Sequence, residues 1–336
     1  MNPLVSIIIP AYNAASYISN CLDSVCNQRY KALEVFVIND CSTDNTQTTV
    51  EQYIESHEDV PIKLLNLTKN AGVSHARNEA FKKANGKYIY LLDSDDDISF
   101  DCIEKLVSLA ESEQYDLVVG ENYLISDEER KHIKVEVLRD SLRDEDILKT
   151  FTLHLWYNQP WNKLVRRDVI QTNRLYFAEG HILEDELWSF QLAASIHSMA
   201  FLKQPIYNYY IRKGSIISSV AKRQRRWDEF FCINSLISQF IKEQQLDKYA
   251  YVGKYFLTNL LVNMGGFQQN NSLNYQAYRK FMGIVCFDIH TLWREKLLTT
   301  REYIAYYYFS LPSPIGIVYY LLMNTLHAFK YRVNIN

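Results

Sequence analysis

The sequence predicts an α/β fold for the first 220 of its 336 residues, followed by an all-helical region. Short apolar runs without polar alternation recur through the first 120 residues, and each is followed by a segment with helical spacing. This order is typical of a Rossmann-like sheet, mostly parallel, with helices on both faces. From Lys222 onward the patterns are helical. We therefore expect two domains, residues 1–220 and residues 221–336.

The first strand is predicted at Leu4–Ile9, a β-branched run that Pro10 is expected to end. A helix from Ser16 to Cys26 follows, behind a serine N-cap. The same alternation predicts strands at Leu33–Ile38, Ile62–Asn66, Tyr88–Leu92 and Leu117–Gly120, and helices at Thr46–Ser56, Ser74–Ala84 and Phe100–Glu113.

The pattern loosens after residue 125. Ser126–Lys134 is strongly charged and is predicted to be a loop, and an acidic helix is expected to begin near Asp144. The later predicted elements are a helix at Glu184–Ser195, a strand at Ile206–Ile211, and helices at Arg226–Glu243, Tyr249–Phe267 and Tyr275–Leu292.

The composition excludes several classes of protein. Hydrophobic residues make up 48% and charged residues 22%, so the chain is neither disordered nor collagen-like. Its six cysteines form no Cys-x-x-Cys pair, which argues against a disulfide framework or a zinc–thiolate site. No secretory signal pattern opens the chain, so we expect a cytoplasmic protein. No nucleic acid is expected among its partners.

The charge is distributed unevenly. Residues 1–150 carry 15 basic and 27 acidic side chains, whereas residues 151–336 carry 21 and 12. An acidic first half suits metal ions and a basic second half suits anionic surfaces such as membranes, although solvated helices of different charge would give the same balance.

In a doubly wound sheet, ligands bind beyond the carboxyl ends of the strands. The first strand is followed by Tyr12 and Asn13 rather than by a glycine-rich turn, which argues against dinucleotide binding. Tyr12 is placed to stack on a base, and Asp40, after the second strand, to accept a hydrogen bond from an imide N–H. These two residues predict recognition of a nucleotide base.

Four carboxylates lie within five residues at the end of the fourth strand, in Asp93-Ser94-Asp95-Asp96-Asp97. Like charges this close repel one another unless a cation lies among them, and oxygen ligands select Mg²⁺ or Mn²⁺ over zinc. We expect Asp93 and Asp95 to contact a metal or a ribose, whereas Asp97 is expected to lie in a solvated turn in which Asp97 or Ser99 caps the next helix.

Four segments, in order and in register, resemble the motifs of family 2 inverting glycosyltransferases of the GT-A fold. They are Val5–Asn13, Asn39–Thr46, Asn70–Asn78 and Leu92–Asp96. The resemblance covers about residues 1–220 and departs from the family at Cys41, where glycine is commoner. The resemblance implies a GT-A domain followed by a helical extension.

The resemblance also implies roles for residues of the nucleotide site. Pro10, Tyr12 and Asp40 would bind the uridine of a UDP-sugar. Arg77 would lie near the base, where it could stack or pair with Asp40. Asp93, with Ser94, would hold the ribose, and Asp95 would coordinate Mn²⁺ or Mg²⁺ at the diphosphate.

An inverting transfer needs a base that deprotonates the acceptor hydroxyl. Glu184-Asp185-Glu186 opens a helix and resembles the family's Glu-Asp pair, with Asp185 in the position of the base and Glu184 in support. Glu186 is expected to be solvated. Acids in a first helical turn also stabilise the helix dipole, which is the structural alternative.

Several other residues are weaker candidates for the site. Trp161 resembles an acceptor-side residue that could stack on a sugar, and a core position is the alternative. Arg212 and Ser215 are expected to reach the diphosphate once a flexible loop closes. His75 and His181 are expected to be structural.

The resemblance implies transfer of a sugar to a hydroxyl of a lipid-linked glycan, in capsule, lipopolysaccharide or exopolysaccharide synthesis at the inner face of the cell membrane.

Tyr303–Phe329 contains 27 residues without a formal charge. We expect it to lie on the membrane surface, with a buried helix and a true span as alternatives. The basic cluster at 222–226 is either solvated or a contact to anionic lipid. The C-terminal helices could instead form a homodimer interface.

Two other functions compete with this prediction. A sugar nucleotidyltransferase would need a glycine-rich loop after its first strand, and Pro10–Asn13 offers none. A catalytically silent binding subunit is disfavoured by the unbroken carboxylate set at Asp40, Asp93, Asp95 and Asp185.

Overall fold

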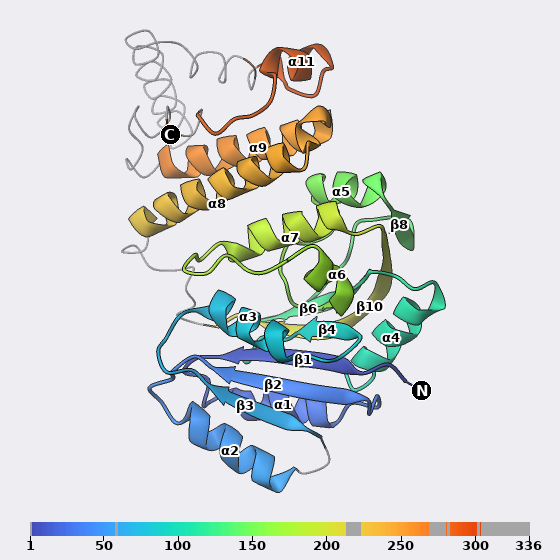
Figure 1. Cartoon of the computed structure of the whole chain (residues 1–336), viewed down its shortest axis with the longest axis vertical. Helices are drawn as coiled ribbons and strands as arrows, with labels where there is room; N and C mark the ends of the chain where they lie inside the picture. Colours follow the sequence, from blue (N-terminus) through green and yellow to red (C-terminus); the bar gives the residue numbers. More distant parts are fainter. Residues whose placement is uncertain are drawn as a thin grey trace. The chain divides into compact units, whose positions relative to one another are not determined.

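The computed structural model describes residues 2–57, 60–212, 223–268, 280, 283–300 and 303 (Figure 1). The chain divides into two compact units, Met1–Val220 and Ala221–Asn336.

Within residues 2–57 and 60–212, a ten-stranded mixed sheet forms the centre of the first unit. Its strands are β1 (Val5–Ala11), β2 (Leu33–Asn39), β3 (Ile62–Asn66), β4 (Tyr88–Leu91), β5 (Asp97–Ile98), β6 (Leu117–Ile125), β7 (Arg130–Ile133), β8 (Ser141–Arg143), β9 (Lys163–Arg166) and β10 (Ser198–Tyr210). The order is β3-β2-β1-β4-β9-β6-β10-β5, with β7 on β6 and β8 on β10. The first four strands of this order are parallel, β9 is antiparallel to both β4 and β6, and β10 is parallel to β6.

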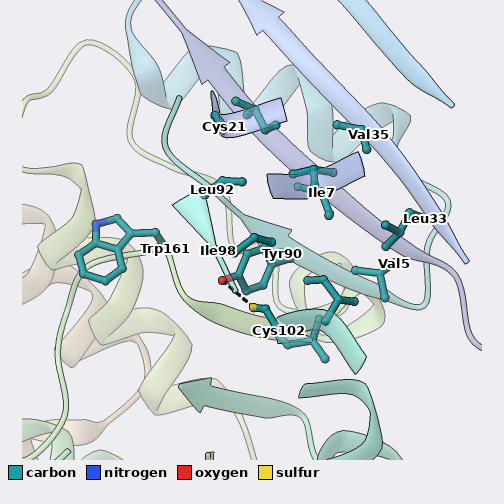
Figure 2. Packing of buried hydrophobic residues seen from close by; sticks show 14 of the residues in the cluster. Val5, Ile7, Cys21, Leu33, Val35, Tyr90, Leu92, Ile98, Cys102 and Trp161 are labelled. Atoms are coloured by element: carbon teal, nitrogen blue, oxygen red, sulfur yellow. Dashed lines mark hydrogen bonds between the residues drawn. The ribbon is translucent and has the colours of Figure 1, made fainter. Parts of the chain in front are cut away.

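Helices cover both faces of this sheet, as predicted. They are α1 (Ile18–Cys26), α2 (Thr46–Ser56), α3 (Val73–Lys83), α4 (Cys102–Ser112), α5 (Glu145–Thr152), α6 (Arg167–Thr172) and α7 (Glu184–Ser195). Alternate residues of β1 and β2, among them Val5, Ile7, Leu33 and Val35, pack in one cluster with side chains of α1, α2 and α4 (Figure 2). Helix α3 packs against β1 and β2. Every residue of β1 and β2 is buried, which explains their unbroken apolar runs.

The prediction that Pro10 ends the first strand is wrong, because β1 continues to Ala11. The carbonyl of Ile8 accepts a hydrogen bond from the amide of Leu92, so the backbone of Ile8 faces β4. Pro10 lies two residues further on, so its backbone nitrogen, which carries no hydrogen, points to the same side. Strand β4 has ended there at Leu91, so a ladder amide is not needed at that position.

Three other predictions were wrong because polar residues interrupt the strands: the loop at Ser126–Lys134, the end of a strand at Gly120 and the start of a strand at Ile206. The predicted loop Ser126–Lys134 contains β7, which pairs with an extended β6. Glu121 of β6 is buried, where its carboxylate accepts hydrogen bonds from His132 (2.7 Å) and from the Val135 amide (3.2 Å). Strand β10 starts at Ser198 rather than Ile206, with irregular register around Pro205. The two-residue β5 was not predicted.

The described part of the second unit is helical, with α8 (Arg223–Glu243), a short 3₁₀ turn η3 (Leu246–Lys248), α9 (Ala250–Gln268) and α11 (Ile289–Arg294). The predicted helix Tyr275–Leu292 is wrong over residues 283–288, which are turns and irregular chain. Asp288 starts a new helix there, because its carboxylate accepts a hydrogen bond from the His290 amide (3.0 Å).

Among the described residues, none of the helices combines the length and the apolar character that crossing a bilayer requires. Residues 304–329 of the predicted membrane-surface segment lie outside the described residues, as do Ser215 and Lys222.

Candidate active site

The predicted site residues follow β1, β2 and β4, and their loops emerge side by side. The Asp40 amide donates to the carbonyl of Ala11 at 2.9 Å, which ties the end of β2 to the end of β1. The Leu92 amide donates to Ile8 at 3.0 Å, which ties the end of β4 to β1 from the other side. The parallel register therefore brings Tyr12, Asp40 and Asp93 to one edge of the sheet, as predicted.

Asp40 is almost completely buried, and it fastens the loop that precedes α3. Its two carboxylate oxygens accept hydrogen bonds from the amides of Ala71 and Gly72, each at 2.8 Å. The predicted pairing of Arg77 with Asp40 is wrong, because Arg77 binds other carboxylates. Tyr12, by contrast, is 50% exposed at the end of β1, so its ring is accessible for stacking on a base.

Cys41, the residue at which the chain departs from the family pattern, has a φ of +57°. That left-handed conformation is costly for a residue with a Cβ and is free of steric cost for glycine. The backbone of this turn therefore explains why glycine is common there.

Replacing Cys41 with glycine should raise the free energy of unfolding by about 0.5–1 kcal/mol, because relief of the left-handed strain exceeds the added freedom of the unfolded chain. Urea denaturation of the purified protein measures this change. Cys26→Gly is the matched control, because Cys26 has helical geometry in α1 and the same substitution should destabilise there. A destabilised Cys41→Gly variant would contradict the strain argument.

Arg77 joins three segments that are far apart in the sequence. Its guanidinium donates to Asp93 at 2.9 Å and to Glu184 at 3.2 Å, and it lies 5.0 Å from the ring centre of Phe177. Only 5% of the Arg77 side chain is exposed. The fork geometry of arginine lets one buried cation bind the carboxylate after β4 and the carboxylate that opens α7. Arg77 of α3 therefore links the loop after β4 to the first turn of α7.

The carboxylates after β4 have different environments. Asp95 lies 3.5 Å from the Nε of Arg212, whose guanidinium stacks 3.8 Å from the ring centre of Tyr17. Burial, with the nearby charge of Asp93, raises the pKa of Asp95. Ser94 is partly exposed. Arg212 is thus already beside the carboxylate that was predicted to lie at the diphosphate.

Asp96 and Asp97 have structural contacts. Asp96 is buried and accepts hydrogen bonds from the Tyr207 hydroxyl (2.7 Å) and the Tyr210 amide (3.0 Å). Burial and the charge of Asp93 raise the pKa of Asp96 to about 8. Asp97 accepts from the Tyr210 hydroxyl at 2.7 Å and belongs to β5. The prediction that Asp97 caps a helix is therefore wrong.

The acidic loop fits a divalent ion that is shared with a ligand. Within the described ranges, no three Asp, Glu, His or Cys side chains gather into a ready-made metal cage. Magnesium-type ions commonly use one or two carboxylates and complete their shell with phosphate oxygens and water. Asp95 suits that use, because 44% of its side chain is exposed and the charge of Asp93 makes a nearby cation favourable.

The first turn of α7 carries the predicted base. Glu184 is buried against Arg77, and burial raises its pKa. The carboxylate of Asp185 accepts a hydrogen bond from the Glu186 amide at 3.0 Å, and burial also raises the pKa of Asp185. The prediction that Glu186 is solvated is wrong, since burial beside Asp185 raises its pKa to about 7. The alternative that these three acids are solvated side chains that only stabilise the helix dipole is therefore not supported.

The segment 156–163 packs against α7, and one of its residues was not predicted to matter. Lys163, at the start of β9, is completely buried, although a lysine in a sequence gives no signal of burial. Trp161 is 7% exposed and belongs to the buried hydrophobic cluster of the first unit (Figure 2). It stacks on Tyr207 with ring centres 4.5 Å apart, so the structure supports its core alternative. His75 pairs with Glu179 at 2.9 Å in the loop that leads to α7, a structural role.

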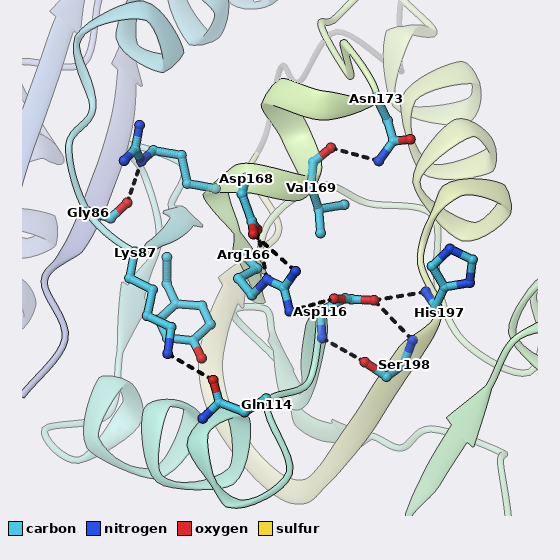
Figure 3. Close-up of polar contacts among 12 residues, drawn as sticks. Gly86, Lys87, Gln114, Asp116, Arg166, Asp168, Val169, Asn173, His197 and Ser198 are labelled. Carbon is cyan, nitrogen blue, oxygen red and sulfur yellow. Dashed lines mark hydrogen bonds and ion pairs between the residues drawn. The ribbon is translucent and has the colours of Figure 1, made fainter.

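A second polar cluster lies at the other edge of the sheet, where β4 and β6 begin (Figure 3). A hollow of about 560 Å³ is bounded there by Asn85, Lys87, Gln114, Arg166, Arg167 and Asp168. Its cations already have partners: Arg166 binds Asp168 and Asp116, and Lys87 binds Glu111. This edge is far along the strands from the acidic loop, so it provides control positions for experiments on the site.

The comparisons agree with this architecture. The family model described as Glycosyl transferase family 2 matches residues 6–174. The uncharacterized glycosyltransferase YibD of Escherichia coli is 31% identical over 218 residues, which cover 63% of this chain and 62% of the relative. The chain therefore spans less than two thirds of that relative's length.

Two solved structures share the fold. S. aureus TarS 1-349 in complex with UDP-GlcNAc has a TM-score of 0.73 at 22% identity, over 91% of this chain and 87% of that chain. The mannosyltransferase PcManGT of Pyrobaculum calidifontis, in complex with GDP-Man and Mn²⁺, has a TM-score of 0.51 at 23% identity, over 70% and 64%. The predicted GT-A fold is thereby confirmed.

Proposed function

The chain belongs to glycosyl transferase family 2, and on that premise we propose that it transfers a sugar from a UDP-sugar, with inversion, to a hydroxyl of a lipid-linked glycan in cell-surface polysaccharide synthesis. The observation that carries the proposal is the bridge made by Arg77. It holds Asp93, at the edge where a nucleotide would bind, together with Glu184, which precedes the proposed base.

The nucleotide would be bound by side chains at the ends of β1, β2 and β4. Tyr12 stacks on the uracil, with Pro10 shaping the end of β1. Asp40 keeps lone pairs free beside its two backbone hydrogen bonds, so it can still accept from the uracil imide. Asp93 and Ser94 hold the ribose.

The diphosphate would lie beside Asp95 and Arg212. When bound at Asp95, Mn²⁺ or Mg²⁺ neutralises negative charge on the UDP leaving group. Arg212 supplies a further cation from the end of β10, and Ser215, which follows it in the chain, is proposed as a hydroxyl donor. That TarS binds UDP-GlcNAc and PcManGT binds GDP-Man supports a nucleotide-sugar donor, with the nucleotide open to test.

Asp185 would act as the base. Its carboxylate takes the proton of the acceptor hydroxyl as that oxygen attacks the anomeric carbon on the face opposite the leaving UDP. Burial raises the pKa of Asp185 toward the working pH, which makes it a stronger base than a solvated aspartate. Glu184, held by Arg77, positions the turn from which Asp185 projects.

A nucleotide-release assay tests this function. The purified protein is incubated with Mn²⁺ and separate UDP-, GDP- and CMP-sugars, and the released nucleotide is measured. We expect release from one UDP-sugar, loss of release on chelation, and at least about a tenfold decrease in Asp95→Asn. Asp168→Asn, at the other edge of the sheet, is the matched control and should behave as wild type.

Calorimetry with UDP, GDP and CMP, each with Mn²⁺, on the same samples distinguishes two reasons for an absence of nucleotide release. Binding without turnover indicates that the acceptor is required. Failure to bind any of the three nucleotides would refute the proposed function.

A further inference from the structure

Tyr17 lies beside the proposed diphosphate site and has so far been given no role in the reaction. It closes the loop between β1 and α1, which opens with Tyr12, and it is 36% exposed. The guanidinium of Arg212 lies 3.8 Å from the centre of its ring. The negative face of an aromatic ring attracts a cation within about 6 Å of the ring centre, so this contact is a close one.

The loop that carries Tyr17 is fastened to its surroundings. The amide of Ala14 donates to the Thr46 hydroxyl at 2.7 Å, and the amide of Ala15 donates to the Asp44 carboxylate at 3.1 Å. The amide of Tyr17 in turn donates to the carbonyl of Ala14 at 2.9 Å. Tyr17 is therefore placed by a loop that is held against the turn after β2.

Arg212 depends on side-chain contacts for its position. The amide of Ile211 donates to the carbonyl of Ile125 at 2.8 Å, so the backbone is held as far as the residue before Arg212. From there a long side chain has to reach the acidic loop, and fixing such a side chain costs conformational entropy. The guanidinium donates to the backbone carbonyl of Asp95, and its Nε lies 3.5 Å from the Asp95 carboxylate.

Tyr17 differs from the other partners of Arg212. The Asp95 carboxylate is the proposed metal ligand, so Arg212 would have to share it with that cation. The ring centre of Tyr210 is more distant, at 5.2 Å, and the Tyr210 hydroxyl already donates to Asp97 at 2.7 Å. The ring of Tyr17 brings no negative charge, so it holds the guanidinium without cancelling the charge that attracts a diphosphate.

We propose that Tyr17 is a positioning residue, whose ring holds the guanidinium of Arg212 where it binds the phosphates of the sugar nucleotide. The proposal rests on the proposed function, because that function places Arg212 at the diphosphate. Contact with the ring restricts the guanidinium before the nucleotide arrives, so less conformational entropy is lost on binding. The loop after β1 thus serves both ends of the nucleotide, with Tyr12 at the base and Tyr17 at the arginine.

The test compares Tyr17→Leu, Tyr17→Phe, Arg212→Met and the double variant of Tyr17→Leu with Arg212→Met. Leucine removes the aromatic ring, whereas phenylalanine keeps the ring and removes only the hydroxyl. Tyr123→Leu is the matched control, because Arg130 of β7 lies at the same 3.8 Å from the ring centre of Tyr123 in β6. Calorimetry at a fixed Mn²⁺ concentration gives the dissociation constant of UDP. Displacement of UDP gives that of uridine, which lacks both phosphates, and Tm reports on the fold.

Tyr17→Leu should weaken UDP binding by about fivefold, as expected for loss of an arginine–ring contact, and should change uridine binding by less than about twofold. Tyr17→Phe should bind UDP as wild type does, since the ring is retained. Arg212→Met should weaken UDP binding at least as much as Tyr17→Leu. The double variant should bind UDP no more weakly than Arg212→Met, because the ring then has no guanidinium to hold. Tyr123→Leu should leave both dissociation constants unchanged, and Tm of Tyr17→Leu should stay within a few degrees of wild type.

Other results would overturn the proposal. If Tyr17→Leu weakens uridine as much as UDP, Tyr17 contacts the nucleoside or supports the fold. If the losses of Tyr17→Leu and Arg212→Met add in the double variant, Tyr17 acts without Arg212. Unchanged UDP binding in either single variant would also contradict the proposal, with transfer from a UDP-sugar still standing. If the wild type binds no nucleotide, the proposed function itself fails, so the two failures can be told apart.

Discussion

Replacing Asp185 with asparagine is expected to lower kcat by about a thousandfold, because an amide cannot accept the proton of the acceptor hydroxyl at neutral pH. Asparagine has the same shape and its oxygen can still accept the hydrogen bond from the Glu186 amide, so the first turn of α7 should keep its conformation. The affinity for UDP, which is bound at the ends of β1, β2 and β4, should stay within about twofold. Steady-state kinetics with donor and acceptor, together with calorimetry of UDP binding, measure the two quantities.

The loss must be specific to the reaction rather than to the fold. Asp168→Asn makes the same chemical change at an exposed carboxylate of α6 and should leave kcat unchanged. Circular dichroism should give both variants the Tm of the wild type within a few degrees. Normal turnover by Asp185→Asn would mean that another group is the base, even with the family and the fold unchanged.

The regular elements of the fold could be predicted wherever the local pattern matched the final environment. The helices at Thr46–Ser56 and Glu184–Ser195 and the strand at Ile62–Asn66 have the bounds that their periodicity predicted. Strand β7, the part of β6 beyond Gly120 and the start of β10 were missed, since charged or polar residues such as Glu121, His132 and Lys203 interrupt them and find their partners only in the folded protein. Glu121 is an example, because its burial depends on His132 from the neighbouring strand.

In the site, too, some features follow from local sequence patterns and others depend on residues that are distant in the sequence. The ends of parallel strands share one edge, so the sequence alone could place Tyr12, Asp40 and Asp93 together. Which carboxylates Arg77 binds depends on where the folded chain places the start of α7, and Glu184 is 107 residues away in the sequence. No local pattern reports such a contact. The burial of Lys163 was missed for the same reason.

Arg77→Met should destabilise the first unit by about 3 kcal/mol, because it leaves the buried carboxylate of Glu184 and the partly buried carboxylate of Asp93 without their shared cation. For a domain of this size, Tm should fall by about 10 °C. Arg29→Met is the control: its ion pair with Glu104 is exposed on both sides, so its loss should change the free energy of unfolding by less than about 0.5 kcal/mol. Thermal and urea unfolding followed by circular dichroism measure both variants.

The stability of Arg77→Met should also depend on pH in a defined direction. Burial raises the pKa of Glu184 and the charge of Arg77 opposes that shift, so the substitution should raise this pKa further. An acid with a higher pKa in the folded than in the unfolded state binds more protons when folded, so the protein is stabilised as the pH falls. The deficit of Arg77→Met relative to wild type should therefore be smaller at pH 5 than at pH 8.

Removing the uncompensated charge should rescue the variant. In Arg77→Met combined with Glu184→Gln, the second carboxylate is replaced by a neutral group of the same shape, and part of the lost stability should return, with less dependence on pH. Arg77→Lys keeps a charge but cannot bind two carboxylates with one planar fork, so it should fall between wild type and Arg77→Met. A deficit that is the same at pH 5 and pH 8, and that Glu184→Gln does not reduce, would show that Arg77 acts through its packing on Phe177 instead of through the two carboxylates.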